Sequence, residues 1–90
     1  MDFWRNITHT AVEIYHGGHR YTVELRIFSL GRNLTLYRDG DEVERASAPA
    51  TFVLEDGAGD GAVIDVGTSE YGFQRAVLHR DGTRTPLRPA

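Results

Sequence analysis

The chain contains no cysteine and no lysine, and each absence removes a class of chemistry. Without cysteine, disulfides, thiolate metal ligands and a catalytic thiol are excluded. All ten basic residues are arginine, so neither a lysine Schiff base nor a P-loop can form. Short secreted proteins commonly depend on disulfides, so the lack of cysteine favours a cytoplasmic location. The arginine-only usage, with abundant Gly, Ala, Val and Asp, indicates GC-rich codons and a bacterial source.

Long hydrophobic runs and a basic surface are missing as well. No apolar stretch approaches the ~20 residues of a membrane span, and the opening MDFWRNITHT does not resemble a secretory signal. The net charge is −3, with arginines interleaved among acids, which argues against a nucleic-acid partner. We therefore expect contact with neither membrane nor nucleic acid, and the motifs present imply no cofactor.

Helical periodicity is absent, and alternation takes its place. From Arg20 to Val43 apolar and polar residues alternate with the period of two that is typical of a half-buried strand. The members expected to face the core are Tyr21, Val23, Leu25, Ile27, Leu34 and Leu36. We expect turns at residues 31–33 and at Asp39-Gly40, where Asp-Gly between alternating runs is a strong hairpin signal.

The same signals recur along the whole chain and predict its fold class. About eight short strands, separated by Gly-Gly and Asp-Gly turns, indicate one all-β domain over residues 1–90, an antiparallel β-sandwich, with a small β-barrel as the alternative. Residues 1–8 are rich in apolar side chains and are expected to dock on the body of the fold. Residues 46–50 should cross between the sheets, a bulge is expected near Gln74-Arg75, and residues 88–90 read as a tail.

Two segments share the pattern Leu-x-Arg-Asp-Gly. Residues 36–40 and 78–82 lie 42 positions apart, and each closes a long predicted strand and opens a short one. Two related halves, each forming one sheet, would account for the repetition.

A wider likeness covers about two-thirds of the chain. The residues that carry it are 21–25 (YTVEL), 34–40, 52–57 and 71–82 (from YGF to DG). In these segments the chain resembles the Fas apoptotic inhibitory molecule family. The resemblance implies a β-sandwich that acts through protein–protein contact, with no catalytic residues to carry over.

The histidines offer a candidate zinc site. His16 and His19 flank a Gly-Gly turn, and zinc binding there would need a third ligand. The residues that could supply it are His9, His79, Glu13 and Asp60. Exposed turn histidines are the simpler interpretation, so we predict no metal.

Catalysis has weak support in the sequence. Ser29, Ser47 and Ser69 lack a nucleophile-elbow context. Glu13 and Glu24, on neighbouring predicted strands, could form an acid–base pair, although ion pairing with arginines is the more ordinary role of such residues. A small hydrolase or isomerase therefore remains an alternative, and no catalytic residue is assigned.

A binding surface is the function that the sequence favours. Outward positions should carry tyrosines and arginines, which are enriched at interaction hot spots. The predicted interaction face comprises Tyr15, Glu24, Arg26, Tyr37 and Arg38. We expect a protein partner, or a second copy of the chain paired through an edge strand at residues 83–87 or 42–45.

The second function left open is that of a carrier for a small apolar ligand. Its pocket would lie between the sheets, near Phe28, Phe52 and Phe73. A cavity among these three rings is what this alternative requires.

Overall fold

All regular structure in the described part of the chain is β-strand. A computed structural model describes residues 9–54 and 61–90. The strands are β1 (His9–His16), β2 (His19–Phe28), β3 (Gly31–Arg38), β4 (Asp41–Ser47), β5 (Ala50–Val53), β6 (Val63–Ser69), β7 (Gly72–Arg80), β8 (Thr83–Pro86) and β9 (Arg88–Pro89). The described residues include no helix that could cross a membrane.

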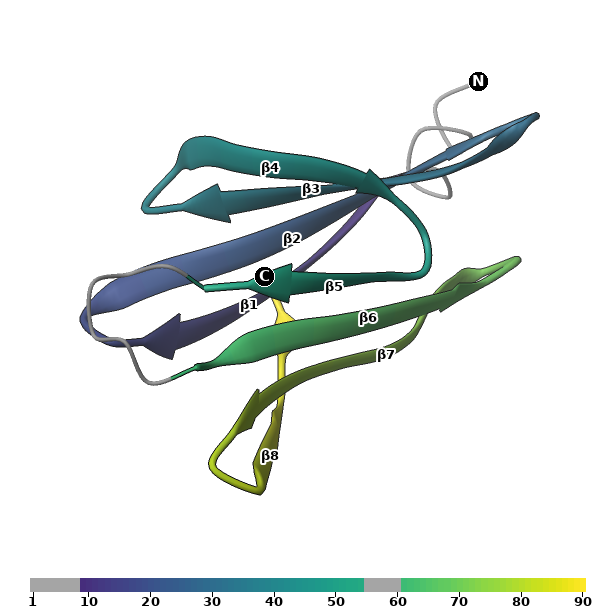
Figure 1. The fold of residues 1–90 in the computed structure, drawn as a ribbon. Helices are drawn as coiled ribbons and strands as arrows, with labels where there is room; N and C mark the ends of the chain where they lie inside the picture. The colour runs from purple at the N-terminus through teal and green to yellow at the C-terminus, as the bar shows by residue number, and fades with distance from the viewer. Residues whose placement is uncertain (1–8, 55–60) are drawn as a thin grey trace.

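The strands form two layers, so the predicted β-sandwich is confirmed. One sheet has the order β4-β3-β2-β1-β9 and the other β5-β6-β7-β8, and every pairing is antiparallel. Figure 1 shows the first four strands stacked over the β5–β8 layer. Among the described strands each sheet has two edge strands and neither closes on itself, so the barrel alternative is wrong. Residues 48–49 carry the chain from one sheet to the other, within the predicted crossing.

The core lies between the layers and follows the predicted alternation. In β2, Tyr21, Val23 and Leu25 are at most 2% exposed, while the intervening side chains face outward. Phe52 and Ile64 meet them from the second sheet and are fully buried. Apolar burial of this kind is the main favourable contribution to folding.

The Asp-Gly turns form as expected, and one predicted turn is displaced. Asp39 and Asp81 adopt positive φ (53° and 49°), and each is followed by a glycine with positive φ, as type I′ hairpin turns require. Residues 31–33 are not a turn, however. They pair with residues 26–28 of β2, and the chain reverses at Ser29-Leu30 instead.

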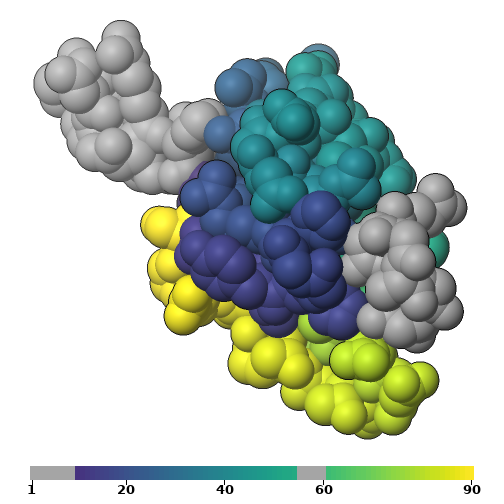
Figure 2. Space-filling view, turned by 90° about the vertical axis from the view of Figure 1, so that its left-hand side faces the viewer, coloured from purple at the N-terminus to yellow at the C-terminus, as the bar shows by residue number. Residues whose placement is uncertain are grey.

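The bulge near Gln74 is confirmed, and the C-terminal tail is a strand. Gly67 lies opposite Arg75 and Thr68 opposite Phe73, which leaves Gln74 as the extra residue. The chain end was expected to be free, but β9 pairs with β1, and the Ala90 amide donates to the Ala11 carbonyl at 3.1 Å. In Figure 2 the yellow C-terminal residues lie against the purple β1 segment.

The two Leu-x-Arg-Asp-Gly segments occupy equivalent places. One ends β3 and leads into β4, an edge of its sheet, and the other ends β7 and leads into β8, an edge of the second sheet. Leu36 and Leu78 are buried at 1% and 6% exposure. The predicted docking of residues 1–8 lies outside the described residues.

Candidate functional site

The outer side of the β1–β4 layer gathers most of the predicted interaction residues. We call this surface the outer face, made of the outward side chains of β1–β4 and β9. Side chains along β2 alternate between the two faces of the sheet, so Glu24 and Arg26 point away from the core that holds Val23 and Leu25. On β3, Tyr37 lies opposite Thr22 and belongs to the same face.

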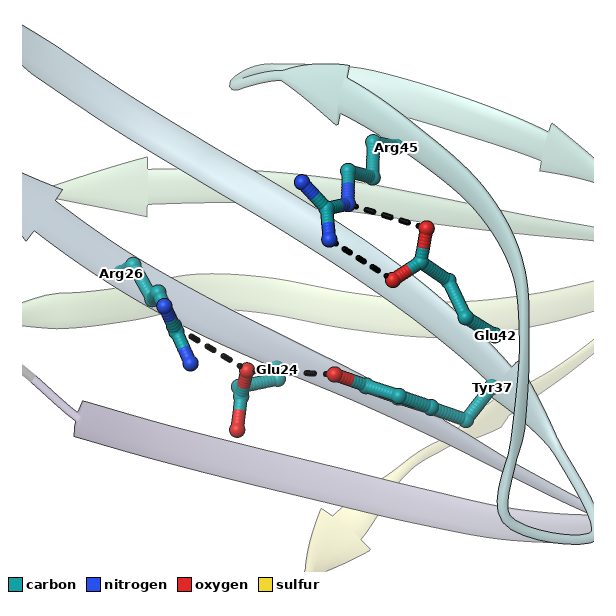
Figure 3. Close-up of polar contacts among 5 residues, drawn as sticks. All are labelled: Glu24, Arg26, Tyr37, Glu42 and Arg45. Carbon is teal, nitrogen blue, oxygen red and sulfur yellow. Dashed lines mark hydrogen bonds and ion pairs between the residues drawn. The ribbon is translucent and has the colours of Figure 1, made fainter.

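A polar network crosses the outer face. The Tyr37 hydroxyl donates to Glu24 Oε1 at 3.4 Å, and Arg26 Nε lies 3.3 Å from the same oxygen. Arg45 donates twice to Glu42, at 2.9 and 3.0 Å, and this carboxylate raises the pKa of the Arg45 guanidinium. Figure 3 shows the Glu24 carboxylate between Arg26 and Tyr37, beside the bidentate Arg45–Glu42 pair.

A shallow hollow lies within this network. Its volume is about 100 Å³, and its lining residues are Glu24, Arg26, Phe28, Asn33, Thr35, Tyr37 and Arg45. Phe28 is 52% exposed, so an aromatic ring stands uncovered beside charged hydrogen-bonding groups. Aromatic area next to arginine is the composition found at protein-binding hot spots.

Tyr15 extends the outer face toward β9. Its side chain is 61% exposed, and the Arg88 guanidinium lies 5.6 Å from the ring centroid, within cation–π range. Arg88 Nε also lies 3.7 Å from Glu13 Oε2. Sequence reasoning missed Arg88, because a two-residue strand that includes proline carries no strand signal.

Arg38 does not belong to the outer face, so its predicted placement there is wrong. It lies opposite Tyr21, whose side chain is buried, and therefore on the inner side of the sheet. There it lines a groove of about 410 Å³ between the β4 and β5 edges. The other lining residues are Tyr21, Leu36, Val43, Glu44, Thr51, Val53 and Leu54.

The three phenylalanines of the ligand-carrier alternative do not surround one cavity. Phe52 is fully buried in the core, and Phe73 packs against the core from β7. Phe28 belongs to the outward set of β2 and lines the hollow on the outer face instead. Its assignment to a pocket between the sheets is wrong, because it shares the parity of Glu24 and Arg26.

The candidate metal ligands serve different local contacts. His19 Nδ1 lies 2.6 Å from Asp39 Oδ2, and the Arg20 amide donates to Asp39 Oδ1 at 2.9 Å. Asp39 thus ties the β3–β4 turn to the start of β2. His16 and His19 face each other across their turn, but among residues 9–54 and 61–90 no three histidine or acidic side chains gather as a metal site would need.

Asp39 gives the fold an acid-sensitive contact. The Arg20 amide, and then His19, lower the pKa of Asp39 below its ordinary 3.8. Because the pKa of Asp39 is lower in the folded state than in the unfolded state, its ionised carboxylate stabilises the fold at pH values above the unfolded-state pKa. This stabilisation is lost as the pH falls through the folded-state pKa. We expect wild-type thermal stability to drop more between pH 5 and pH 2 than that of Asp39→Asn, measured as Tm against pH.

Asp81→Asn is the matched control for this experiment. Asp81 holds the same turn position in the β7–β8 hairpin, also at positive φ, and Asn tolerates that conformation. Its ion-pair partner is Arg80, at 3.8 Å. Between pH 5 and pH 2 the Tm of Asp81→Asn should fall as much as that of the wild type. An equally reduced fall in Tm in both variants would contradict a specific role for the His19–Asp39 contact.

Ser69 and the two carboxylates considered for catalysis have structural partners. Ser69 Oγ accepts a hydrogen bond from the Tyr71 amide at 3.2 Å, within the β6–β7 turn. Glu13 and Glu24 sit on adjacent strands, but Glu13 pairs with Arg88 and Glu24 with Arg26. These groups supply charge and hydrogen bonds suited to noncovalent recognition.

The opposite outer surface, on β5–β8, carries a separate ion pair. Arg75 Nε donates to Asp65 Oδ2 at 2.9 Å, and Arg75 lowers the pKa of Asp65. Gly67 leaves room for the guanidinium, since a Cβ there would lie 2.5 Å from Arg75 Nη1. This surface provides a reference against which the outer face can be tested.

Comparison with protein-family models yields no match, and comparisons with curated proteins and with solved structures yield none either. The resemblance to the Fas apoptotic inhibitory molecule family therefore stays a prediction. What this chain does must be inferred from its own residues.

Proposed function

We propose that this protein is a non-catalytic protein-interaction module and that its contact surface is the outer face. The observation that carries the proposal is the uncovered aromatic area of Tyr15 and Phe28 on a sheet surface that is otherwise largely polar or charged. Exposed aromatic rings beside arginine supply both the apolar area and the hydrogen bonds that partner proteins use. The absence of cysteine is consistent with a cytoplasmic partner.

The geometry also suggests which residues anchor the partner. Tyr37 is half-buried on the face and its hydroxyl donates to Glu24, so its ring is already oriented before binding. A pre-ordered side chain loses less entropy on association than a mobile one. Phe28, at the border of the hollow, offers the apolar area that a partner side chain can cover.

The test compares variants of the two sheet surfaces in one affinity-capture experiment. Proteins retained by the wild-type chain are quantified by mass spectrometry for Phe28→Ala, Tyr37→Ala and, on the opposite surface, Arg84→Ala. We expect the first two to lose a defined partner by about tenfold or more, as hot-spot truncations do. Arg84→Ala, on the exposed strand β8, should retain it.

Folding is checked in every variant by circular dichroism and urea denaturation. A specific partner lost from both outer-face variants while they remain folded supports the proposal. The proposal is overturned if the retained proteins are the same for all three variants, or if Arg84→Ala loses the partner and the outer-face variants keep it.

A further inference from the structure

We propose that β4 pairs with β4 of a second copy of this chain, antiparallel and centred on the Val43–Glu44 bond. This inference does not rest on the proposed function, which is carried by Tyr15 and Phe28, although Glu42 and Arg45 also lie on the outer face. Among the edge strands that the structure describes, β4 is the longest, with seven residues against two in β9 and four each in β5 and β8. Figure 1 shows it along the border of its sheet.

A β-bulge gives β4 an unusual facing pattern. The register with β3 shifts between Leu36 and Tyr37, which leaves Val43 as the extra residue. Glu42 and Arg45 both face outward, opposite Tyr37 and Thr35, and they form an ion pair of 2.9 Å. Residues three apart in a regular strand point to opposite faces, so this ion pair is itself evidence of the shift.

The shift makes β4 complementary to its own reverse. The inner-facing positions are Asp41, Val43, Glu44 and Ala46, judged from their partners on β3 and, for Val43, from the groove that it lines. Counted away from the Val43–Glu44 bond, the three residues on each side face inward, outward and inward in turn. They are 43, 42 and 41 in one direction and 44, 45 and 46 in the other. In the proposed register each Glu42 therefore lies opposite Arg45 of the other copy, on the same face.

The bulge also explains why a second copy fits better than another strand. Bulged edges resist pairing with regular strands, because the bulge puts later residues on the wrong face. A second β4 carries the same bulge at the matching position, so the two irregularities compensate. Glu42 and Arg45 of both copies then form two cross-strand ion pairs, while Arg38 lines the same groove as Glu44 and supplies positive charge beside it.

The other edges fit this role less well. β8 ends in Pro86, which has no amide hydrogen to donate to a neighbouring strand. β5 and β9 are short. A dimer through β4 would join the two five-stranded sheets into one continuous sheet, with both outer faces on the same side.

The charge pattern allows a strict test by sedimentation of the full chain from low micromolar to near-millimolar concentration. We expect a concentration-dependent dimer, weakened by about tenfold or more in Arg45→Glu, which places like charges opposite each other in both pairs. The double variant Glu42→Arg with Arg45→Glu restores the opposite charges and should restore the dimer. Arg84→Glu, on β8, is the control and should dimerise like the wild type.

Cysteine chemistry maps the register, because the chain has no cysteine of its own. Glu42→Cys mixed with Arg45→Cys should give more disulfide-linked dimer under mild oxidation than either variant alone. A chain that stays monomeric at every concentration overturns the proposal. So does a dimer that is unaffected by Arg45→Glu, one that the double variant fails to restore, or crosslinking that shows no preference for the mixture.

Discussion

Replacing Phe52 by alanine should lower the free energy of unfolding by about 3–5 kcal/mol, the usual cost of removing a buried aromatic ring. Phe52 is fully buried, and it enters the core from β5, a strand of four residues paired on one side with β6. A domain of this size is stable by only about 5–10 kcal/mol. The variant should therefore lie close to its unfolding transition at room temperature.

Urea denaturation followed by circular dichroism measures this loss. Val53→Ala is the neighbouring control: its side chain is 57% exposed, and it should cost less than about 1 kcal/mol. A loss at Phe52 no larger than that at Val53 would contradict the packed core, and would revive the view that the space between the sheets is open to a ligand.

The fold could be predicted because its signals are local. Alternation in β2 names the core residues directly, and Asp-Gly pairs require the positive φ that type I′ turns use. The displaced turn shows the limit of this reasoning. Ser29-Leu30 contains neither Asn-Gly nor Asp-Gly, so the glycine at position 31 led to a predicted turn at residues 31–33. In the structure Phe28 pairs with Gly31, which makes Gly31 the first residue of β3.

The candidate site was less accessible to sequence reasoning, for two different reasons. Arg38 and Phe28 were assigned to the wrong faces, although the alternation of side chains along each strand would have placed them correctly. Arg38 follows outward-facing Tyr37, and Phe28 follows Ile27 of the core set. Arg88, in contrast, reaches Tyr15 and Glu13 through a pairing between the two ends of the described chain. Such a contact depends on which strands become neighbours in the sheet, and no local sequence pattern shows this.

Leu36→Ala and Leu78→Ala should each lower the free energy of unfolding by about 2–5 kcal/mol, the range for leucines truncated in cores. The prediction follows from the repeated Leu-x-Arg-Asp-Gly segments. In both segments the leucine is buried, and the aspartate three residues later begins a turn with positive φ. The same spacing therefore positions one anchor under each edge hairpin, β3–β4 and β7–β8.

Equal losses in the two variants would mean that both hairpins depend on the same kind of anchor, as two related halves require. The control is His79→Ala, at the second position of its segment, where the side chain is half-buried on the opposite side of β7 from Leu78. It should cost less than about 1 kcal/mol. A large loss at Leu36 with little at Leu78 would show that the shared motif records only a common turn, since a turn needs its Asp-Gly pair but not a buried leucine beneath it.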